Sequence, residues 1–280
     1  MQKIKNLLVT GYQNRQMGVD IFLPNTQPSP VVIYAHGFNG FKDWGNFDLI
    51  ATTFADAGFA FIKFNFSHNG TSPEHPEEFV DLEAFGQNNY TIQLADLQII
   101  LNWVSDPKNA YANYLDVHQI FLIGHSMGGG ISILQAAEDT RIKKLVTWAS
   151  ISECKTPWGN WDEERIRKWK QNGVDYYLNG RTKQNMPLYY QLYEDYVQNE
   201  SRLDIRKAIN TLRIPILICH GNKDTSVSIN KAYELVAAQQ SAELFTQESD
   251  HVFGRTHPWP HTYLPEPMEA VVSKTIQWLQ

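Results

Sequence analysis

The sequence predicts an α/β fold in which helices cover both faces of a mostly parallel β-sheet. Short apolar runs alternate along the chain with longer segments of helical periodicity, as they do in folds that alternate strand and helix. The apolar runs are nearly continuous, which is expected of strands that are covered on both faces. With 280 residues, of which 42% are hydrophobic and 19% charged, the chain can bury a sizeable core. We therefore expect one domain over residues 1–280.

Each element is predicted from its local pattern. A turn flanked by the apolar runs 7–10 and 19–23 predicts an antiparallel hairpin at one edge of the sheet. Ser228 is placed to cap the helix that follows it, and Pro265 and Pro267 mark the start of the last helix. Core strands are expected at residues 31–35, 60–65, 119–123, 144–149 and 214–220, and a further strand at 242–247. Helical spacing of apolar residues predicts helices at 46–57, 90–104, 131–138, 229–239 and 267–279.

Charge and cysteine content argue against several classes of protein. The net charge of −6 comes from acids and bases that are mixed along the chain, so we expect no nucleic-acid partner and no anionic-membrane partner. Cys154 and Cys219 cannot form a disulfide framework, and no stretch approaches the roughly 18 apolar residues of a membrane span. The first residues lack the apolar segment of a secretory signal. We expect a soluble cytoplasmic protein, and a homodimer is compatible with the sequence.

The strongest motif is Gly124-His125-Ser126-Met127-Gly128, which follows the apolar run 119–123 and precedes a helical segment. Small residues two positions before and after a serine allow a strand to turn sharply into a helix, with the serine hydroxyl exposed at the turn. The alternatives are a glycine-rich turn without chemistry and a phosphate-binding loop. The second is weaker, because the chain has neither G-x-G-x-x-G nor G-K-[ST] here. We expect Ser126 to be a nucleophile.

A serine nucleophile needs a base, and the base needs an orienting acid. His251 follows the strand expected at 242–247, at the end where open α/β sheets place their sites. Asp224 follows the strand expected at 214–220, and the order Ser126, Asp224, His251 is nucleophile, acid, base. Glu153 is the alternative acid, and His257 and His261 are the alternative bases. We interpret His220 as a turn residue.

Acyl transfer builds negative charge on a carbonyl oxygen, so the site also needs two N–H donors. One is expected to be the backbone N–H of Met127, the residue after the nucleophile. The other should lie in His36-Gly37-Phe38-Asn39-Gly40, which follows the strand at 31–35, and we expect the N–H of Phe38. We expect no metal and no cofactor, because no cysteine or paired carboxylate accompanies a cluster of His251, His257 and His261.

With these residues placed, the chain resembles the α/β-hydrolase superfamily over almost its whole length. The resemblance rests on His36-Gly37-Phe38, the segment from Gly124 to Gly129, Gly221-Asn222-Lys223-Asp224 and Asp250-His251-Val252-Phe253. Within the superfamily it looks most like bacterial carboxylesterases related to cinnamoyl (feruloyl) esterases and dienelactone-hydrolase-like proteins. The resemblance implies Phe38 and Met127 as oxyanion donors, and it implies a lid inserted between the sixth and seventh strands.

The segment 151–210 fits that place, because it lacks strand–helix alternation and is rich in tryptophan and tyrosine. A structureless loop of this length is unusual in a compact domain, so we expect an inserted lid with its own helices. Its aromatic side chains are expected to roof the pocket above Ser126, with Trp161 and Tyr190 as substrate contacts. The alternative is that these aromatic residues only add to the core.

The sequence thus predicts a cofactor-free serine hydrolase that cleaves the carboxylic ester of a small molecule through an acyl-enzyme. Thioesterase, lysophospholipase, amidase and small-peptide hydrolase activities would use the same mechanism. A ligand-binding receptor that keeps the pocket and a slow triad is the alternative from another class, because a fold does not dictate function.

Overall fold

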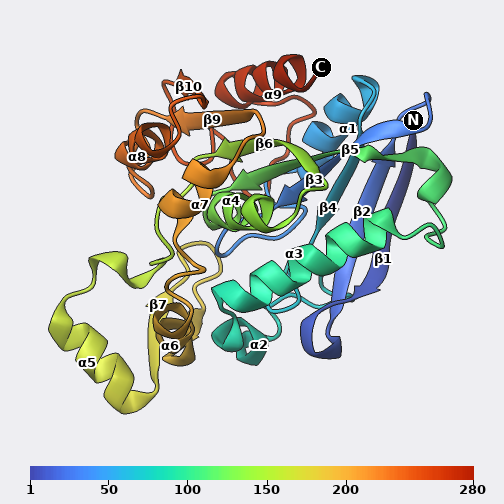
Figure 1. Cartoon of the computed structure of the whole chain (residues 1–280). Helices are drawn as coiled ribbons and strands as arrows, with labels where there is room; N and C mark the ends of the chain where they lie inside the picture. Colours follow the sequence, from blue (N-terminus) through green and yellow to red (C-terminus); the bar gives the residue numbers. More distant parts are fainter.

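A central sheet of eight strands organises the chain, in the order β1-β2-β4-β3-β5-β6-β9-β10 (Figure 1). The structure is a computed structural model that describes all 280 residues. β1 and β2 pair antiparallel at one edge, β2 is antiparallel to β4, and the other neighbours are parallel. The predicted mostly parallel sheet is confirmed. The strands are β1 (Gln2–Thr10), β2 (Gln16–Leu23), β3 (Ser29–Ala35), β4 (Ala60–Phe64), β5 (Leu115–His125), β6 (Ile142–Trp148), β9 (Ile216–Gly221) and β10 (Glu243–Gln247).

Successive side chains of the parallel strands enter two separate hydrophobic layers. Val31 and Ile33 of β3 belong to a cluster of 46 buried residues, whereas Val32 and Tyr34 belong to a cluster of 22. This alternation follows from the pleat of a strand, whose successive side chains point to opposite faces. Because both faces are buried, both sets of positions must be apolar, and the strand sequences are therefore continuous apolar runs.

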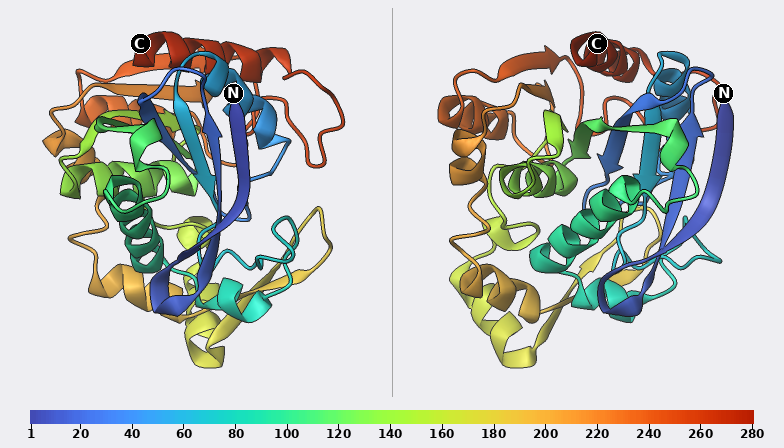
Figure 2. Two further views of the ribbon diagram at one scale, coloured as in Figure 1. Left: turned by 90° about the vertical axis from the view of Figure 1, so that its right-hand side faces the viewer. Right: turned by 45° about the vertical axis from the view of Figure 1, so that its right-hand side comes forward.

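Helices cover both layers of the sheet (Figure 2). The helices α1 and α9 contribute side chains to the smaller cluster, and α3, α4 and α8 contribute to the larger one. No helix combines the length and the apolar character that crossing a bilayer would require. The helices outside residues 151–210 are η1 (Tyr12–Asn14), α1 (Phe47–Asp56), α2 (Leu82–Gln87), α3 (Tyr90–Ser105), η2 (Ala112–Tyr114), α4 (Met127–Glu138), α8 (Asn230–Ala238) and α9 (Glu266–Leu279), with part of α7 described below.

Local sequence signals predict where some helices begin and miss where others begin. The Asn89 side chain accepts a hydrogen bond from the Ile92 N–H and caps α3. Ser228 lies one residue before the N-cap of α8, and its Oγ accepts from the Asn230 N–H at 3.3 Å. The helix predicted from residue 131 begins already at Met127. Sequence analysis does not predict this first turn, because residues 128–130 are glycines and glycine is a poor helix former.

Residues 151–210 leave the sheet after β6 and return to it before β9, and their central part, from α5 to α6, lies at the bottom of both views in Figure 2. The antiparallel pair β7–β8 was not expected from the sequence. It packs on α2, where a Cβ on Gly86 would lie 3.0 Å from the Tyr189 ring and Tyr189 Oη donates to Glu83. The segment comprises η3 (Trp158–Asn160), α5 (Glu163–Asn172), β7 (Val174–Leu178), β8 (Asn185–Tyr189), α6 (Gln191–Gln198) and the start of α7 (Ile205–Thr211).

Candidate active site

Ser126 occupies the sharp turn between β5 and α4, with φ of 56° and ψ of −121°. Residues other than glycine rarely adopt a positive φ, and backbone strain of this kind is concentrated at functional turns. The neighbouring glycines are required by contact. A Cβ on Gly124 would lie 2.3 Å from the Gly128 carbonyl oxygen, and one on Gly128 would lie 2.3 Å from the Ala35 carbonyl oxygen. The structure thus forms the turn that the sequence motif predicts.

Asp224 and His251 lie in loops that follow the neighbouring strands β9 and β10, and their side chains meet. His251 Nδ1 lies 2.7 Å from Asp224 Oδ2, while Asp224 Oδ1 accepts from the backbone N–H groups of Ser226 and Val227, each at 2.8 Å. Burial alone would raise the pKa of Asp224, but hydrogen bonds from His220 and His251 outweigh it and hold that pKa well below its usual range. Asp224 is therefore a fixed carboxylate that orients the His251 ring.

The alternative acid and the two alternative bases each contact other groups of the protein. Glu153 is held among cationic side chains, with Arg206 at 3.5 Å and Lys231 at 3.7 Å. His257 Nδ1 accepts from the Gly45 N–H at 3.1 Å, and its ring stands edge-on to Phe41. His261 is exposed; its ring stacks on Tyr263 and stands edge-on to Trp259. Of the candidates, the structure brings only Asp224 and His251 into contact with each other.

Two further histidines support this pair. His220 was expected to be a turn residue, but it lies within β9 and is fully buried, because its ring packs against the Asp224 loop. Its Nε2 lies 2.8 Å from the Val227 carbonyl oxygen and 3.4 Å from Asp224 Oδ2. His125 lies beside the nucleophile, and its Nε2 is 2.9 Å from the His251 carbonyl oxygen. Burial, together with the neighbouring His251, lowers the pKa of His125 well below its usual value. His125 is therefore neutral, and its Nε2–H can donate to that carbonyl and fix the His251 backbone.

One cavity of about 180 Å³ joins Ser126 and His251 to the loop after β3. We call residues 36–46 the oxyanion loop. It approaches the nucleophile so closely that a Cβ on Gly37 would lie 2.9 Å from Ser126 Cβ. The Phe38 N–H donates to no other group of the protein. Met127 is the first residue of α4, so its N–H is one of those that a helix leaves without an intrahelical partner. Phe38 lines the cavity, and Met127 directly follows Ser126, which lines it too.

Arg255 lines the same cavity and has no carboxylate partner. Its side chain is only 2% exposed, its Nε donates to the Val252 carbonyl oxygen at 3.1 Å, and its Nη1 is buried without a hydrogen-bond partner. The guanidinium carbon lies 5.5 Å and 5.1 Å from the ring centroids of Trp44 and Phe47. Burial lowers the pKa of Arg255 to about 10, which leaves it charged at neutral pH. No local sequence pattern indicates this buried position, because a loop arginine usually faces solvent.

The two expected substrate contacts of the 151–210 segment lie elsewhere. Trp161 and Tyr190 pack edge-on against Trp169, at centroid distances of 5.2 Å and 5.3 Å, and neither lines the cavity. The segment instead approaches the oxyanion loop through Tyr177 of β7, whose ring centroid lies 5.6 Å from that of Phe38. Sequence periodicity could not select Tyr177, because all the tyrosines of the segment share the same local composition.

Comparison with known proteins agrees with this architecture. The family described as alpha/beta hydrolase fold matches residues 30–193, and the chain belongs to this family. Est1E from Butyrivibrio proteoclasticus is similar over 100% of this chain and 98% of its own, with a TM-score of 0.66 and 16% identity. A dienelactone hydrolase of Anabaena variabilis is similar over 99% of this chain and 98% of its own, with a TM-score of 0.63 and 16% identity. At these identities the likeness concerns the fold.

Relatives by sequence match a smaller part of the chain. The quorum-quenching protein AidA of Acinetobacter baumannii is 27% identical over 131 residues, which are 45% of this chain and 38% of AidA. An uncharacterized 31.7 kDa protein of Escherichia coli is 28% identical over 124 residues, which are 44% of this chain and 38% of that protein. The matches therefore span well under half of each relative.

Proposed function

We propose that this hydrolase is a serine esterase that acts on small carboxylic esters through an acyl-enzyme. The observation that carries the proposal is the 2.7 Å contact between His251 Nδ1 and Asp224 Oδ2, at a cavity that also contains the strained Ser126. A nucleophile, a base and an acid on three loops of one sheet edge are the minimum set for this chemistry.

In the first half of the reaction, Ser126 Oγ attacks the ester carbonyl carbon while His251 Nε2 takes the hydroxyl proton. The N–H groups of Phe38 and Met127 donate to the oxygen that becomes negative, and Asp224 stabilises the protonated ring. Collapse of the tetrahedral intermediate breaks the bond to the alcohol, which leaves with the proton from His251. In the second half, His251 takes a proton from water, and the resulting hydroxide attacks the acyl carbon. The acid is released, and Ser126 Oγ regains its proton.

The cavity favours a small substrate with a negatively charged group. Its volume of about 180 Å³ lies below the roughly 300–1,000 Å³ that are common for drug-sized ligands. An unpaired buried charge is costly, and the Nη1 of Arg255 has no partner within the protein. A carboxylate on the substrate would supply a counter-charge for the guanidinium through a charge-assisted hydrogen bond. Phe38, Phe41 and Trp44 line the remaining wall and suit an aliphatic or aromatic group.

We assign a lid role to residues 151–210, with Tyr177 as the residue that acts on the pocket. Tyr177 packs on Phe38, and Phe38 both lines the cavity and provides an oxyanion donor. Movement of the β7–β8 hairpin would therefore move the Phe38 ring. Trp161 and Tyr190 support the hairpin from the Trp169 side and do not select the substrate in this proposal.

Labelling with a fluorophosphonate tests the nucleophile, because this reagent forms a covalent bond to an activated serine. We expect the wild type to be labelled and Ser126→Ala to remain unlabelled and folded. Turnover of a panel of 4-nitrophenyl esters then separates an enzyme from a receptor with a slow triad. The panel includes thioester and amide analogues and a feruloyl ester, since ferulic acid is bound in one structure of Est1E. Ester turnover by Ser126→Ala within tenfold of the wild type would contradict the proposal.

A further inference from the structure

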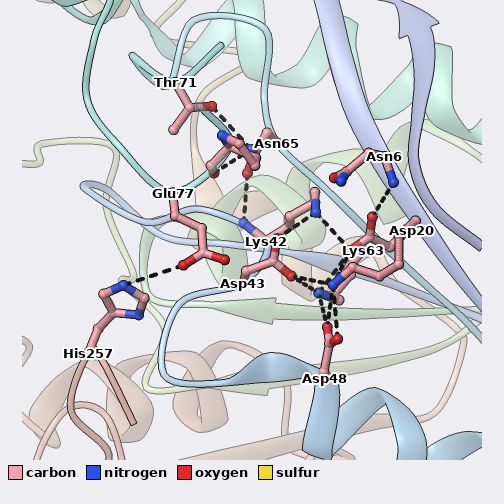
Figure 3. Close-up of polar contacts among 12 residues, drawn as sticks. Asn6, Asp20, Lys42, Asp43, Asp48, Lys63, Asn65, Thr71, Glu77 and His257 are labelled. Carbon is pink, nitrogen blue, oxygen red and sulfur yellow. Dashed lines mark hydrogen bonds and ion pairs between the residues drawn. The ribbon is translucent and has the colours of Figure 1, made fainter. Parts of the chain in front are cut away.

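A buried ion cluster lies at the C-terminal half of the oxyanion loop. We define it as Lys5, Asp20, Lys42, Asp43, Asp48 and Lys63, and Figure 3 shows its inner members converging from three elements and the loop. Lys42 Nζ lies 2.8 Å from Asp20 Oδ2 and 2.5 Å from Asp43 Oδ2. Lys63 Nζ lies 3.0 Å from Asp20 Oδ2 and 2.6 Å from Asp48 Oδ1, and it also contacts Asp43. The side chains of Lys42, Lys63 and Asp20 are 0% exposed.

The cluster is electrically balanced without any added ion. Carboxylate oxygens of Asp20, Asp43 and Asp48 lie within 4.8 Å of one another, a grouping that could attract a metal cation. The three lysine ammonium groups already contact these same carboxylates, with Lys5 Nζ 2.8 Å from Asp48 Oδ1. Three positive charges therefore meet three negative ones. The attraction of Lys63 and Lys42 overcomes the effect of burial, and it holds the pKa of Asp20 and that of Asp43 below their usual range.

Stability alone does not explain so many buried charges. Removing two charges from water costs about as much as their attraction returns, and an apolar replacement of similar volume is often equally stable. The charges also restrict geometry, because an ammonium group that binds two carboxylates is held in one position relative to both. The bonds join the loop residue Lys42 to Asp20 of β2 and the next loop residue, Asp43, to Lys63 of β4. Lys63 in turn contacts Asp48 of α1.

Neutral hydrogen bonds fix the same loop at further points. The Lys42 N–H donates to Asn65 Oδ1 at 2.7 Å, and Asn65 Nδ2 donates to the Pro76 carbonyl oxygen at 3.0 Å. At the other end of the loop, the Phe66 N–H donates to His36 Nε2 at 3.3 Å. Burial lowers the pKa of His36 to about 4, so the ring stays neutral and Nε2 remains an acceptor at pH 7. Phe38 lies between these anchors and lines the cavity.

From this arrangement we infer that the buried ion cluster is a positioning device for the oxyanion loop, with Lys42 and Asp20 as positioning residues for the reaction. The cluster holds the loop in one place, and the Phe38 N–H is thereby aimed at the oxygen that becomes negative. The inference rests on the proposed esterase function. A donor that shifts by about 1 Å can cost on the order of 10²-fold in rate, and loss of one donor costs about 10²- to 10³-fold in kcat.

The test compares single and paired substitutions at the innermost ion pair. Lys42→Met leaves Asp20 buried without its nearest ammonium group and should lower both Tm and kcat. The pair Asp20→Asn with Lys42→Met removes one charge of each sign, so the remaining cluster is balanced again. Because no uncompensated charge remains, we expect the pair to recover most of the Tm that the single variant loses. We expect kcat to stay about 10- to 100-fold below the wild type, with KM within about threefold.

A matched control removes an ion pair that is distant from the loop. Lys274 Nζ lies 2.5 Å from Glu243 Oε1 between α9 and β10, and neither residue lines the cavity. Lys274→Met with Glu243→Gln should leave kcat within twofold of the wild type. A second measurement uses an alkyl boronic acid, which occupies the oxyanion site when it binds the nucleophile. Its Ki should rise by the same factor by which kcat falls in Asp20→Asn with Lys42→Met.

Recovery of both Tm and kcat in the paired variant would overturn the inference, because the cluster would then serve stability only. If the paired variant does not fold, Asn65→Ala tests the same loop anchor without touching a charge. A folded Asn65→Ala variant with unchanged kcat and boronate Ki would overturn the inference as well. Failure of the esterase proposal is distinguishable, because the wild type itself would then show neither ester turnover nor fluorophosphonate labelling.

Discussion

Replacing Arg255 with methionine removes a buried charge while it keeps much of the side-chain volume. A hydrogen bond to a charged group contributes about 1.5–3 kcal/mol, and about 1.4 kcal/mol corresponds to a factor of ten. If the guanidinium binds a substrate carboxylate, kcat/KM for an anionic ester should fall about 10- to 150-fold. A neutral ester of equal length should change little, because the Trp44 side of the cavity remains in place. Stability should not fall, because Nη1 has no partner within the protein. The Val252 carbonyl oxygen loses the Nε donor but still accepts from the backbone N–H of residue 255 at 3.3 Å.

The assay for Arg255 compares two 4-nitrophenyl esters with four-carbon acyl chains, butyrate and the hemiester of succinate. The ratio of their kcat/KM values cancels general effects on the nucleophile and on folding. Arg255→Lys keeps a charge but loses the planar fork, so it should recover only part of the preference. A ratio that is the same in the wild type and in Arg255→Met would refute the reasoning. The arginine would then serve only to stack on Trp44 and Phe47.

Three further outcomes can be checked with the same enzyme. Ser126→Ala should lower kcat by several orders of magnitude without loss of Tm, and a mild effect would exclude this serine as nucleophile. Asp224→Asn should lower kcat about 10⁴-fold, as the equivalent change does in a serine protease, whereas Glu153→Gln should change it less than twofold. Because the pKa of Asp224 is lowered in the folded chain, its contribution to the free energy of unfolding is complete above the unfolded-state value of about 3.9. Urea titrations should therefore show the stability difference between wild type and Asp224→Asn shrinking as pH falls below about 4. Tyr177→Ala should change KM and the ranking of ester substrates with little effect on Tm. Trp161→Ala should lower Tm and leave KM and the substrate ranking unchanged. Equal substrate rankings for Tyr177→Ala and the wild type would exclude the lid role.

The sequence predicts the features that are determined by residues close to one another along the chain. Continuous apolar runs specify strands that are buried on both faces, and glycines around Ser126 are needed wherever a strand turns directly into a helix. Asp224 and His251 could be found because each follows a strand of the same sheet, so the fold brings the ends of those strands together. The expectation that Trp161 and Tyr190 contact the substrate rests on the composition of the segment. Composition does not specify which of its aromatic side chains faces the pocket.

The features that the sequence did not predict all depend on long-range contacts. Lys42 and Lys63 have the sequence appearance of surface lysines. Their burial depends on carboxylates that include Asp20, which lies on β2 and far from both lysines in the sequence. Arg255 follows His251 by four residues in a loop, and its burial depends on the rings of Trp44 and Phe47. Charged side chains are rarely buried without groups that interact with them, and when those groups are distant in the sequence, a local pattern does not show them.

The oxyanion loop is the point at which these long-range contacts act on the proposed chemistry. Its Lys42 and Asp43 bind the ion cluster, and its Trp44 packs over the Arg255 guanidinium. The loop is thus held from one side by charges within the protein and from the other side by the group that we assign to the substrate carboxylate. An anionic substrate that draws on Arg255 would act on the same loop that presents the Phe38 N–H. Substrate charge and oxyanion stabilisation would then be coupled through Trp44, so the preference for an anionic ester should appear in kcat as well as in KM.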